Sequence, residues 1–222
     1  MDCIIDIMVR PLTARDRDYA RFPLNACFGA PSHVAVLRTL FWAGGGMTGR
    51  QIARMSGVAV GAGLETLGRL EEAGLVRWLP QGRAHVYELC RDHVLVKGGL
   101  GPAFEAESGF RAGIRRLLKE SLKGRVRAAA LFGSVARRED RPDSDLDLVL
   151  VVDRERDLEA AQEAAQAVSG RLRKEFGVRL APLVFSLPEF KRQCRQGSSF
   201  FKTLLKEAEG VTGAELEELG RG

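Results

Sequence analysis

Long apolar runs, paired cysteines and a basic leader are all missing from this sequence. No stretch approaches the roughly 18 uninterrupted apolar residues that a membrane span requires. The first ten residues hold only a short apolar stretch, which is broken by Asp6 and lacks the positive charge of a signal peptide. The four cysteines are scattered, with no C-x-x-C pair and no cluster with histidine; they are Cys3, Cys27, Cys90 and Cys194. These absences argue against a membrane partner, a disulfide framework and structural zinc, and they predict a cytoplasmic protein.

Strong charge of one sign is also lacking. The 222 residues carry a formal net charge of +5 and the pI is near 9.3. Residues 1–100 hold 12 basic and 9 acidic side chains, and the remainder of the chain holds 22 and 20. Neither half is therefore strongly basic, and this balance permits nucleic acid as a partner without favouring it. The length allows one large domain or two small ones.

The first half of the sequence begins with a leader at residues 1–28, to which the pattern assigns no role. Ser32 is then expected to cap a helix whose apolar positions recur at helical spacing, and the glycines at 44–46 end it. Thr48 is expected to cap a second helix, with Met55 facing inward. Two amphipathic helices are therefore predicted before residue 57.

A third helix and two strands are predicted next. The helix covers residues 60–73 and carries Leu64 on its apolar face, and the strands cover 75–79 and 84–89 with a Pro- and Gly-containing turn between them. Three helices followed by a hairpin is the order of a winged helix-turn-helix. We therefore predict a domain of this type at residues 29–97.

The stretch MTGRQIARMSGVAVGAGLETLGRLEEAGLVRW resembles the core of winged helix-turn-helix transcriptional regulators. The carrying residues are the Gln51-Ile52-Ala53 helix, the Ser56-Gly57-Val58 turn and residues 70–76, which lead into the hairpin. In such families the third helix enters the major groove of double-stranded DNA and the hairpin touches the backbone. The resemblance implies DNA binding, transcription regulation and, because half-sites are usually paired, a homodimer.

The sequence departs from that family where bases would be read. The third helix starts Val60-Gly61-Ala62-Gly63, which offers no side chain that donates to or accepts from a base edge. The remaining candidates for base reading are Glu65, Thr66 and Arg69. The candidates for phosphate contact are Arg50, Arg54, Arg77 and Arg83. The alternative interpretation is a winged helix used for dimerisation or protein contact.

Residues 98–124 are interpreted as a connecting helical segment. Its apolar residues fall on one face and its basic residues, among them Arg111 and Arg115, lie elsewhere. The segment is interpreted as a packing helix with a solvated basic face, and a nucleic-acid surface is the alternative.

Two apolar runs in the second half flank a set of small and acidic residues. The run at 128–132 ends in Gly133-Ser134, and the run at 148–152 is preceded by Asp145-Leu146-Asp147. Residues two apart in a strand share a face, so both carboxylates are expected to point the same way. Two adjacent carboxylates repel each other unless a cation lies between them, and oxygen ligands of this kind suit Mg²⁺ or Mn²⁺.

The glycine and serine fit a phosphate. Gly133 permits close backbone approach, Ser134 supplies a hydroxyl, and residues 135–139 are expected to start a helix whose amides face an anion. Three nearby basic residues are further candidates for phosphate contact, although each is more simply a surface residue: Arg137, Arg138 and Arg141. Together with the carboxylates, this pattern predicts a site for a magnesium-bound nucleotide.

The run LFGS followed by PDSDLDL is similar to the motif of minimal nucleotidyltransferases in the polymerase-β-like superfamily. The resemblance implies an α+β chain with a C-terminal nucleotidyltransferase-like domain at residues 125–222, built on a small mixed sheet flanked by helices. It implies that Gly133 and Ser134 bind the nucleotide, for which ATP is the first candidate although the sequence does not specify the base. It assigns Asp145 and Asp147 to metal binding and catalysis.

Active members of that family usually add a third carboxylate from a later strand. The expected strand, residues 178–185, contains no acid, and its alternating positions are Arg179, Ala181 and Leu183. Asp153 and Glu189 lie near strand ends, but no spacing argument supports either. The missing acid weakens the case for a working transferase, because two-metal chemistry requires a complete ligand set.

Three functions follow from these patterns. The first is a nucleotidyltransferase with a DNA-binding domain, transferring to a hydroxyl acceptor on a partner protein, as antitoxin-like members of the family do. The second is a transcriptional regulator that only senses the nucleotide. The third is a scaffold without a ligand. The four motif residues favour nucleotide binding over the scaffold, and the missing acid favours sensing over transfer.

Overall fold

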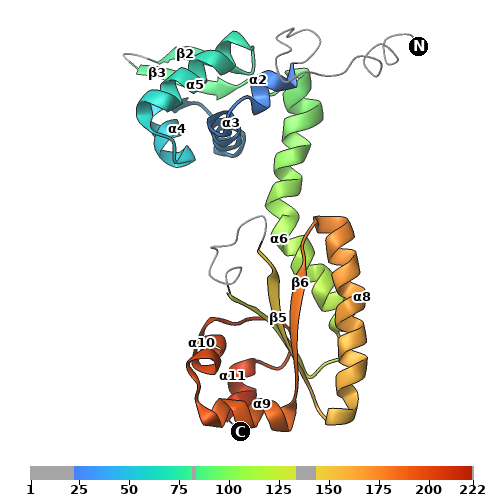
Figure 1. The fold of residues 1–222 in the computed structure, drawn as a ribbon. Helices are drawn as coiled ribbons and strands as arrows, with labels where there is room; N and C mark the ends of the chain where they lie inside the picture. The colour runs from blue at the N-terminus through green and yellow to red at the C-terminus, as the bar shows by residue number, and fades with distance from the viewer. Residues whose placement is uncertain (1–22, 82–83, 134–143, 222) are drawn as a thin grey trace, which may run out of the picture. The chain divides into compact units, whose positions relative to one another are not determined.

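A computed structural model of the protein describes residues 23–81, 84–133 and 144–221. The chain divides into two compact units, residues 1–108 and 109–222 (Figure 1). Each unit has its own hydrophobic core. No helix within the described ranges is both long enough and apolar enough to cross a membrane.

The N-terminal unit is built from helices and a small antiparallel sheet. Its helices are α2 (Leu24–Phe28), α3 (Pro31–Ala43), α4 (Gly49–Ser56), α5 (Val60–Glu72) and the single π-turn Val96–Leu100. Its strands are β1 (Met47–Thr48), β2 (Val76–Gln81) and β3 (Ala84–Leu89), in the order β1-β3-β2. The predicted helices and hairpin are therefore present, with boundaries shifted by one or two residues, and the short strand β1 is an addition that its two-residue length hid from pattern reading.

The helix starts of this unit show which capping predictions hold. Thr48 caps α4 with a complete capping box, in which its hydroxyl accepts from the Gln51 amide and the Gln51 side chain accepts from the Thr48 amide. The prediction for Ser32 is wrong. Ala30 is the N-cap of α3, Pro31 takes the first helical position, and the Ser32 hydroxyl instead accepts a hydrogen bond from Thr66.

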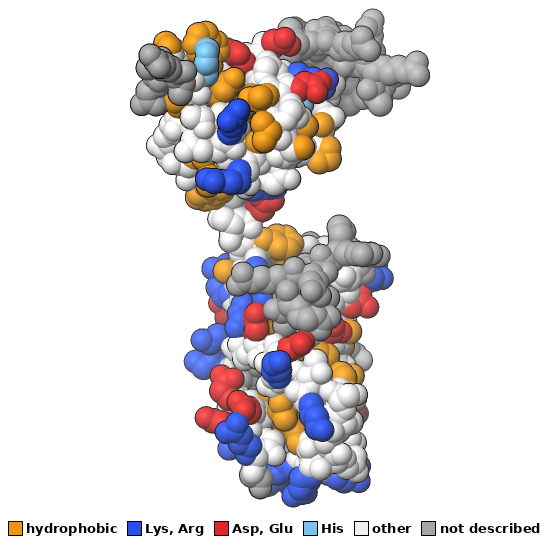
Figure 2. Space-filling model, turned by 90° about the vertical axis from the view of Figure 1, so that its left-hand side faces the viewer, with side chains coloured by type: hydrophobic (Ala, Val, Ile, Leu, Met, Phe, Trp, Pro, Cys, Tyr) orange, Lys and Arg blue, Asp and Glu red, His pale blue; other side chains and the backbone are white. Residues whose placement is uncertain are grey.

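Two apolar residues of this unit face outward where inward positions were predicted. Met55 is 62% exposed and Leu64 is 45% exposed. The core instead takes Ile52 from α4 and Leu67 from α5, together with the fully buried Cys27 of α2. Hydrophobic side chains accordingly gather on the surface of this unit, with scattered basic ones among them (Figure 2). Because α2 contributes to this core, the end of the predicted leader belongs to the N-terminal unit.

The predicted connecting segment is one helix, α6 (Gly101–Leu122), with a part in each unit. Phe104 packs in the N-terminal core, and Leu118 and Leu122 are fully buried in the C-terminal core. On the same helix, Arg111 and Arg115 both bind the carboxylate of Glu209 within the C-terminal unit. These two arginines therefore anchor α6 to the C-terminal unit.

The C-terminal unit is a four-stranded sheet with helices on both faces (Figure 1). Its strands are β4 (Ala128–Phe132), β5 (Leu146–Val152), β6 (Leu180–Ser186) and β7 (Glu209–Gly213), in the order β6-β5-β4-β7. Strand β4 is antiparallel to both neighbours, whereas β5 and β6 are parallel. The predicted small mixed sheet is therefore present.

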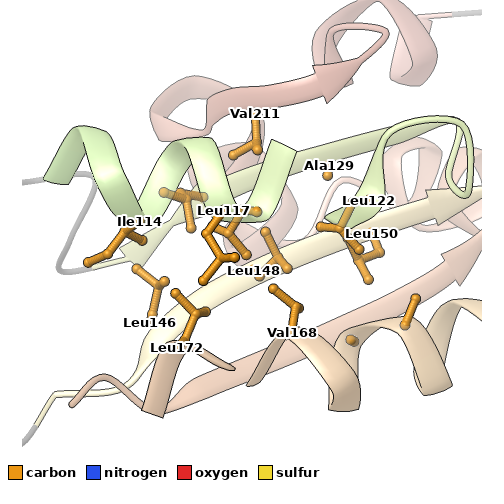
Figure 3. Packing of buried hydrophobic residues seen from close by; sticks show 14 residues of the cluster. Ile114, Leu117, Leu122, Ala129, Leu146, Leu148, Leu150, Val168, Leu172 and Val211 are labelled. Atoms are coloured by element: carbon orange, nitrogen blue, oxygen red, sulfur yellow. The ribbon is translucent and has the colours of Figure 1, made fainter. Parts of the chain in front are cut away.

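Alternation along the strands divides the core into two layers. Leu146, Leu148 and Leu150 pack against α6 and α8 (Leu158–Phe176), as Figure 3 shows for the labelled residues. Val149 and Val151 point to the opposite face, which is covered by α9 (Leu187–Gln196), α10 (Ser199–Glu207) and α11 (Leu216–Arg221). Because side chains alternate, Asp147 belongs to this second face.

Candidate functional site

Gly133 and Asp147 meet where β4 ends and β5 begins. Asp147 pairs with Phe132, the last residue of β4, so its side chain lies beside the glycine that follows. Gly133 has φ +72°, and a Cβ built there would overlap Oδ2 of Asp147 and lie 3.1 Å from its Cγ. Only glycine combines this left-handed conformation with this close approach to a carboxylate.

Asp145 lies one residue before β5 and two residues from Asp147. If the alternation of β5 continues one residue further, Asp145 lies on the same sheet face as Asp147, and this arrangement stays a prediction of the spacing. Asp145 also has a positively charged neighbour, because Nε of Arg179 lies 2.8 Å from its Oδ1. Arg179 was noted in the sequence only as a position of the strand at 178–185 that lacks a carboxylate. Its ion pair with Asp145 was not predicted.

Several predicted contributors lie outside the described residues. They are Ser134, the helix start at 135–139 and the three arginines at 137, 138 and 141. Their proposed contacts with phosphate stay predictions.

The candidate third carboxylates occupy other places. Strand β6 carries Ala181 opposite Asp147 and has no acid of its own. Asp153 follows the far end of β5, where Arg127 lies 3.8 Å away. Glu189 lies in the first turn of α9, and hydrogen bonds from Gln193 and Arg192 lower the pKa of its carboxyl. Neither acid belongs to the site that Asp145 and Asp147 define.

A small cavity of about 140 Å³ opens beside Gly133. Its lining is largely apolar. The lining residues are Phe132, Gly133, Phe200, Thr203, Leu204 and Glu207. Four of these residues come from α10, about 70 residues further along the chain. Sequence reasoning missed them because no local pattern indicates that α10 packs against the end of β4.

The donor set of this site fits one divalent cation better than two. Mg²⁺ is commonly held by one or two carboxylates together with substrate phosphates, which Asp145 and Asp147 could supply. A pair of ions needs more ligands, and within the described ranges no three side chains of the metal-binding types come close enough to share a metal. The arginine on Asp145 further reduces the free negative charge.

The candidate DNA-contacting residues of the N-terminal unit differ in exposure and in ion pairing. Arg50 and Arg54 are exposed on α4. Arg69 pairs with Glu65 at 2.6 Å and Arg77 with Glu88 at 3.1 Å, so both basic charges already have an acidic neighbour. Arg83 lies outside the described residues.

Thr66 does not fit its predicted role in base reading. Its side chain is only 4% exposed, and its hydroxyl donates to Ser32 Oγ at 2.9 Å, which joins α5 to α3. A hydroxyl used inside the unit cannot reach a base edge. The position looked suitable because threonine is usually exposed, and the burial comes from the packing of α5 onto α3.

Comparison with known proteins identifies the class of the C-terminal unit. Residues 114–198 match the family described as "Polymerase beta, Nucleotidyltransferase". The matched stretch begins within α6 and ends after α9, so it contains Gly133, Asp145 and Asp147. The chain therefore contains a nucleotidyltransferase-like domain.

Two solved structures are similar to part of the chain. A toxin–antitoxin crystallised with AMP-PNP has a TM-score of 0.33 at 12% identity, covering 48% of this chain and 81% of that one. A mutant of the toxin–antitoxin MntA-HpeT has a TM-score of 0.32 at 12% identity, covering 50% of this chain and 80% of that one. No curated protein matches the chain.

Proposed function

We propose that the C-terminal unit binds a nucleoside triphosphate, with ATP as the first candidate, together with Mg²⁺ or Mn²⁺, and transfers its nucleotidyl group to a hydroxyl acceptor. The observation that carries this proposal is the close approach of Gly133 to Asp147, with Asp145 two residues earlier, within the nucleotidyltransferase match. The glycine lets backbone amides approach a phosphate, and the carboxylates supply hard oxygen ligands for the cation that accompanies it.

The reaction needs little covalent chemistry from the protein. The acceptor oxygen bonds to the α-phosphorus, the bond from that phosphorus to the bridging oxygen breaks, pyrophosphate leaves, and the hydroxyl proton passes to solvent. Positioning and charge stabilisation are therefore the main contributions of the site. The cavity beside Gly133 offers a place for a small apolar part of the nucleotide or the acceptor.

The direct test uses ATP and GTP labelled on the α-phosphate, with Mg²⁺ or Mn²⁺ and a lysate of the natural host. We expect the wild-type protein to transfer label to a macromolecule, and the Asp145→Asn/Asp147→Asn variant to transfer none. Asp153→Asn is the control, because it removes one carboxylate charge at the other end of β5.

Each result of this test has a definite meaning. Equal labelling by the wild type and the double variant would exclude the aspartates from catalysis. If the wild type binds nucleotide without transferring label, and only the double variant loses this binding, the function is that of a ligand-sensing regulator and not of a transferase. Binding of neither nucleotide by the wild type would refute the proposal.

For the N-terminal unit we propose a winged helix that contacts the DNA backbone. Three helices followed by a hairpin is the order that this fold requires. Within the helix-turn-helix itself, the first of the two helices crosses the DNA backbone. That helix is α4, where Arg50 and Arg54 are one turn apart and exposed. The exposed start of α5 is apolar at Val60 and Leu64, so base reading is not expected.

The salt dependence of DNA affinity tests this second role. We expect duplex DNA of random sequence to bind at low salt, and Arg50→Gln/Arg54→Gln to reduce the slope of log affinity against log salt by about 2, since each phosphate contact contributes roughly 0.9. Arg38→Gln on α3 provides a control for loss of charge elsewhere. A slope unchanged in the double variant would remove α4 from the interface and leave protein contact as the role of this unit.

A further inference from the structure

The pairing of β5 with β6 brings Arg179 beside Asp145. Leu146 pairs with Leu180 in this parallel register, and the Leu146 amide donates to the Arg179 carbonyl at 2.8 Å. The residues just before these two, Asp145 and Arg179, are therefore also neighbours, and their side chains meet at 2.8 Å. The position of this ion pair therefore follows from the strand register.

Arg179 lies on the strand from which a third carboxylate would be expected. On the same face of β6, Ala181 is opposite Asp147 and Leu183 is opposite Val149, so neither position offers an oxygen. A divalent cation together with one carboxylate carries a single net positive charge. A guanidinium carries that same charge permanently, because arginine is not deprotonated in proteins.

We propose that Arg179 replaces one metal ion and the third carboxylate, so that the C-terminal unit binds its nucleotide with a single divalent cation. This inference rests on the proposed nucleotide site and specifies its metal requirement. Asp147, which Gly133 contacts from the end of β4, is the principal metal ligand, and Asp145 is shared between the cation and Arg179. An acceptor hydroxyl in this site receives no activation from a second ion, so nucleotide binding is retained more fully than transfer.

The ion pair is open to solvent, which makes the substitution testable. The side chains of Arg179 and Asp145 are 59% and 48% exposed. An exposed pair of this kind contributes little to stability, so a change at residue 179 is expected to leave the fold intact. A metal titration therefore reports on the site rather than on unfolding.

The experiment measures Mn²⁺ binding to the full chain by electron paramagnetic resonance, with and without an ATP analogue whose α,β-bridge cannot be cleaved. We expect one Mn²⁺ per wild-type chain. Arg179→Gln is expected to tighten Mn²⁺ binding about five- to tenfold, because a positive charge next to the ion is removed. Arg179→Asp is expected to raise the stoichiometry to two in the presence of the analogue.

Arg171→Gln is the matched control, since Arg171 is an exposed arginine of the same unit that pairs with Glu175. Unchanged Mn²⁺ affinity in Arg179→Gln relative to this control would overturn the proposal, as would two Mn²⁺ ions in the wild type or no Mn²⁺ in any variant. Failure of the proposed function has a different signature. In that case the nucleotide analogue does not bind, while the effect of residue 179 on Mn²⁺ alone is still measured.

Discussion

At the scale of single residues, Gly133 satisfies two conditions at once. Its φ of +72° lies in the left-handed region, and its missing side chain leaves room for the Asp147 carboxylate. Gly177 at the end of α8 has a similar φ of +68° but nothing within 4 Å of a built Cβ. Alanine substitutions at these two positions therefore distinguish the free-energy cost of the left-handed backbone from the effect of a clash with Asp147.

We predict that Gly133→Ala and Gly177→Ala both lose roughly 1–2 kcal/mol of unfolding free energy from the left-handed backbone. Only Gly133→Ala is expected to displace Asp147 and weaken nucleotide binding, by tenfold or more. Urea unfolding and a nucleotide titration measure the two effects. Equal nucleotide affinity in both variants would show that the contact with Asp147 does not shape the site.

Local spacing was enough to predict some of these residues. The i, i+2 aspartates and the preceding glycine were found because strand alternation and glycine geometry are local rules. The partner of Asp145 was not found. Its contact with Arg179 depends on the register of a parallel pair separated by α8, and such long-range register leaves no local trace. The same reason explains the buried Thr66.

At the scale of elements, two glycines in α5 have different causes. Gly61 has nothing within 4 Å of a built Cβ, whereas a Cβ at Gly63 would lie 3.0 Å from Cβ of Ala53 on α4. By helix propensity alone, each of these glycines would weaken the helix. In the structure, Gly63 lets α4 and α5 pack closely, and Gly61 has no such role.

We predict that Gly61→Ala raises the unfolding free energy by about 0.5–1 kcal/mol, because alanine loses less backbone entropy in a helix. Gly63→Ala is expected to forfeit that gain through the tight contact with Ala53. Urea denaturation followed by circular dichroism measures both. An equal increase of the unfolding free energy in both variants would show that α4 and α5 accommodate the extra methyl group at residue 63 without loss of stability.

The other errors at this scale share one physical cause. Helical periodicity predicted where α4 and α5 lie but placed Met55 and Leu64 inward, and both are exposed. A three-helix pattern specifies an apolar stripe, while the packing partners decide which residues at its border are covered. Partners distant in sequence cannot be read from the stripe alone.

At the scale of the whole molecule, the two cores are separate and α6 contributes to both. The sequence placed boundaries at 97 and 124, whereas the chain divides between Ser108 and Gly109. Composition marked 98–124 as distinct because it is helical and basic. It gave no sign that the first turns of that helix complete one core and the last turns complete the other.

We predict that the two units lose their structure in separate transitions. Both tryptophans, Trp42 and Trp78, belong to the N-terminal unit, so their fluorescence reports on that unit only. Leu118→Ala should destabilise the C-terminal unit by about 2–5 kcal/mol and leave the fluorescence midpoint in place. Leu67→Ala should shift that midpoint. A shared shift in both variants would show that the chain unfolds as one cooperative body.

Strand β6 is an edge strand of the four-stranded sheet in the described part of the chain, and Pro182 is its third residue. Without Pro182 the run LAPLVFS would be apolar and rich in strand-forming residues, which is the profile of a segment that templates intermolecular β-addition. Proline supplies no amide donor and interrupts that template. Pro182→Val should therefore increase light scattering during refolding, while the same change at exposed Pro188 on α9 should not. We therefore expect Pro182 to hinder edge-to-edge association of copies of this chain.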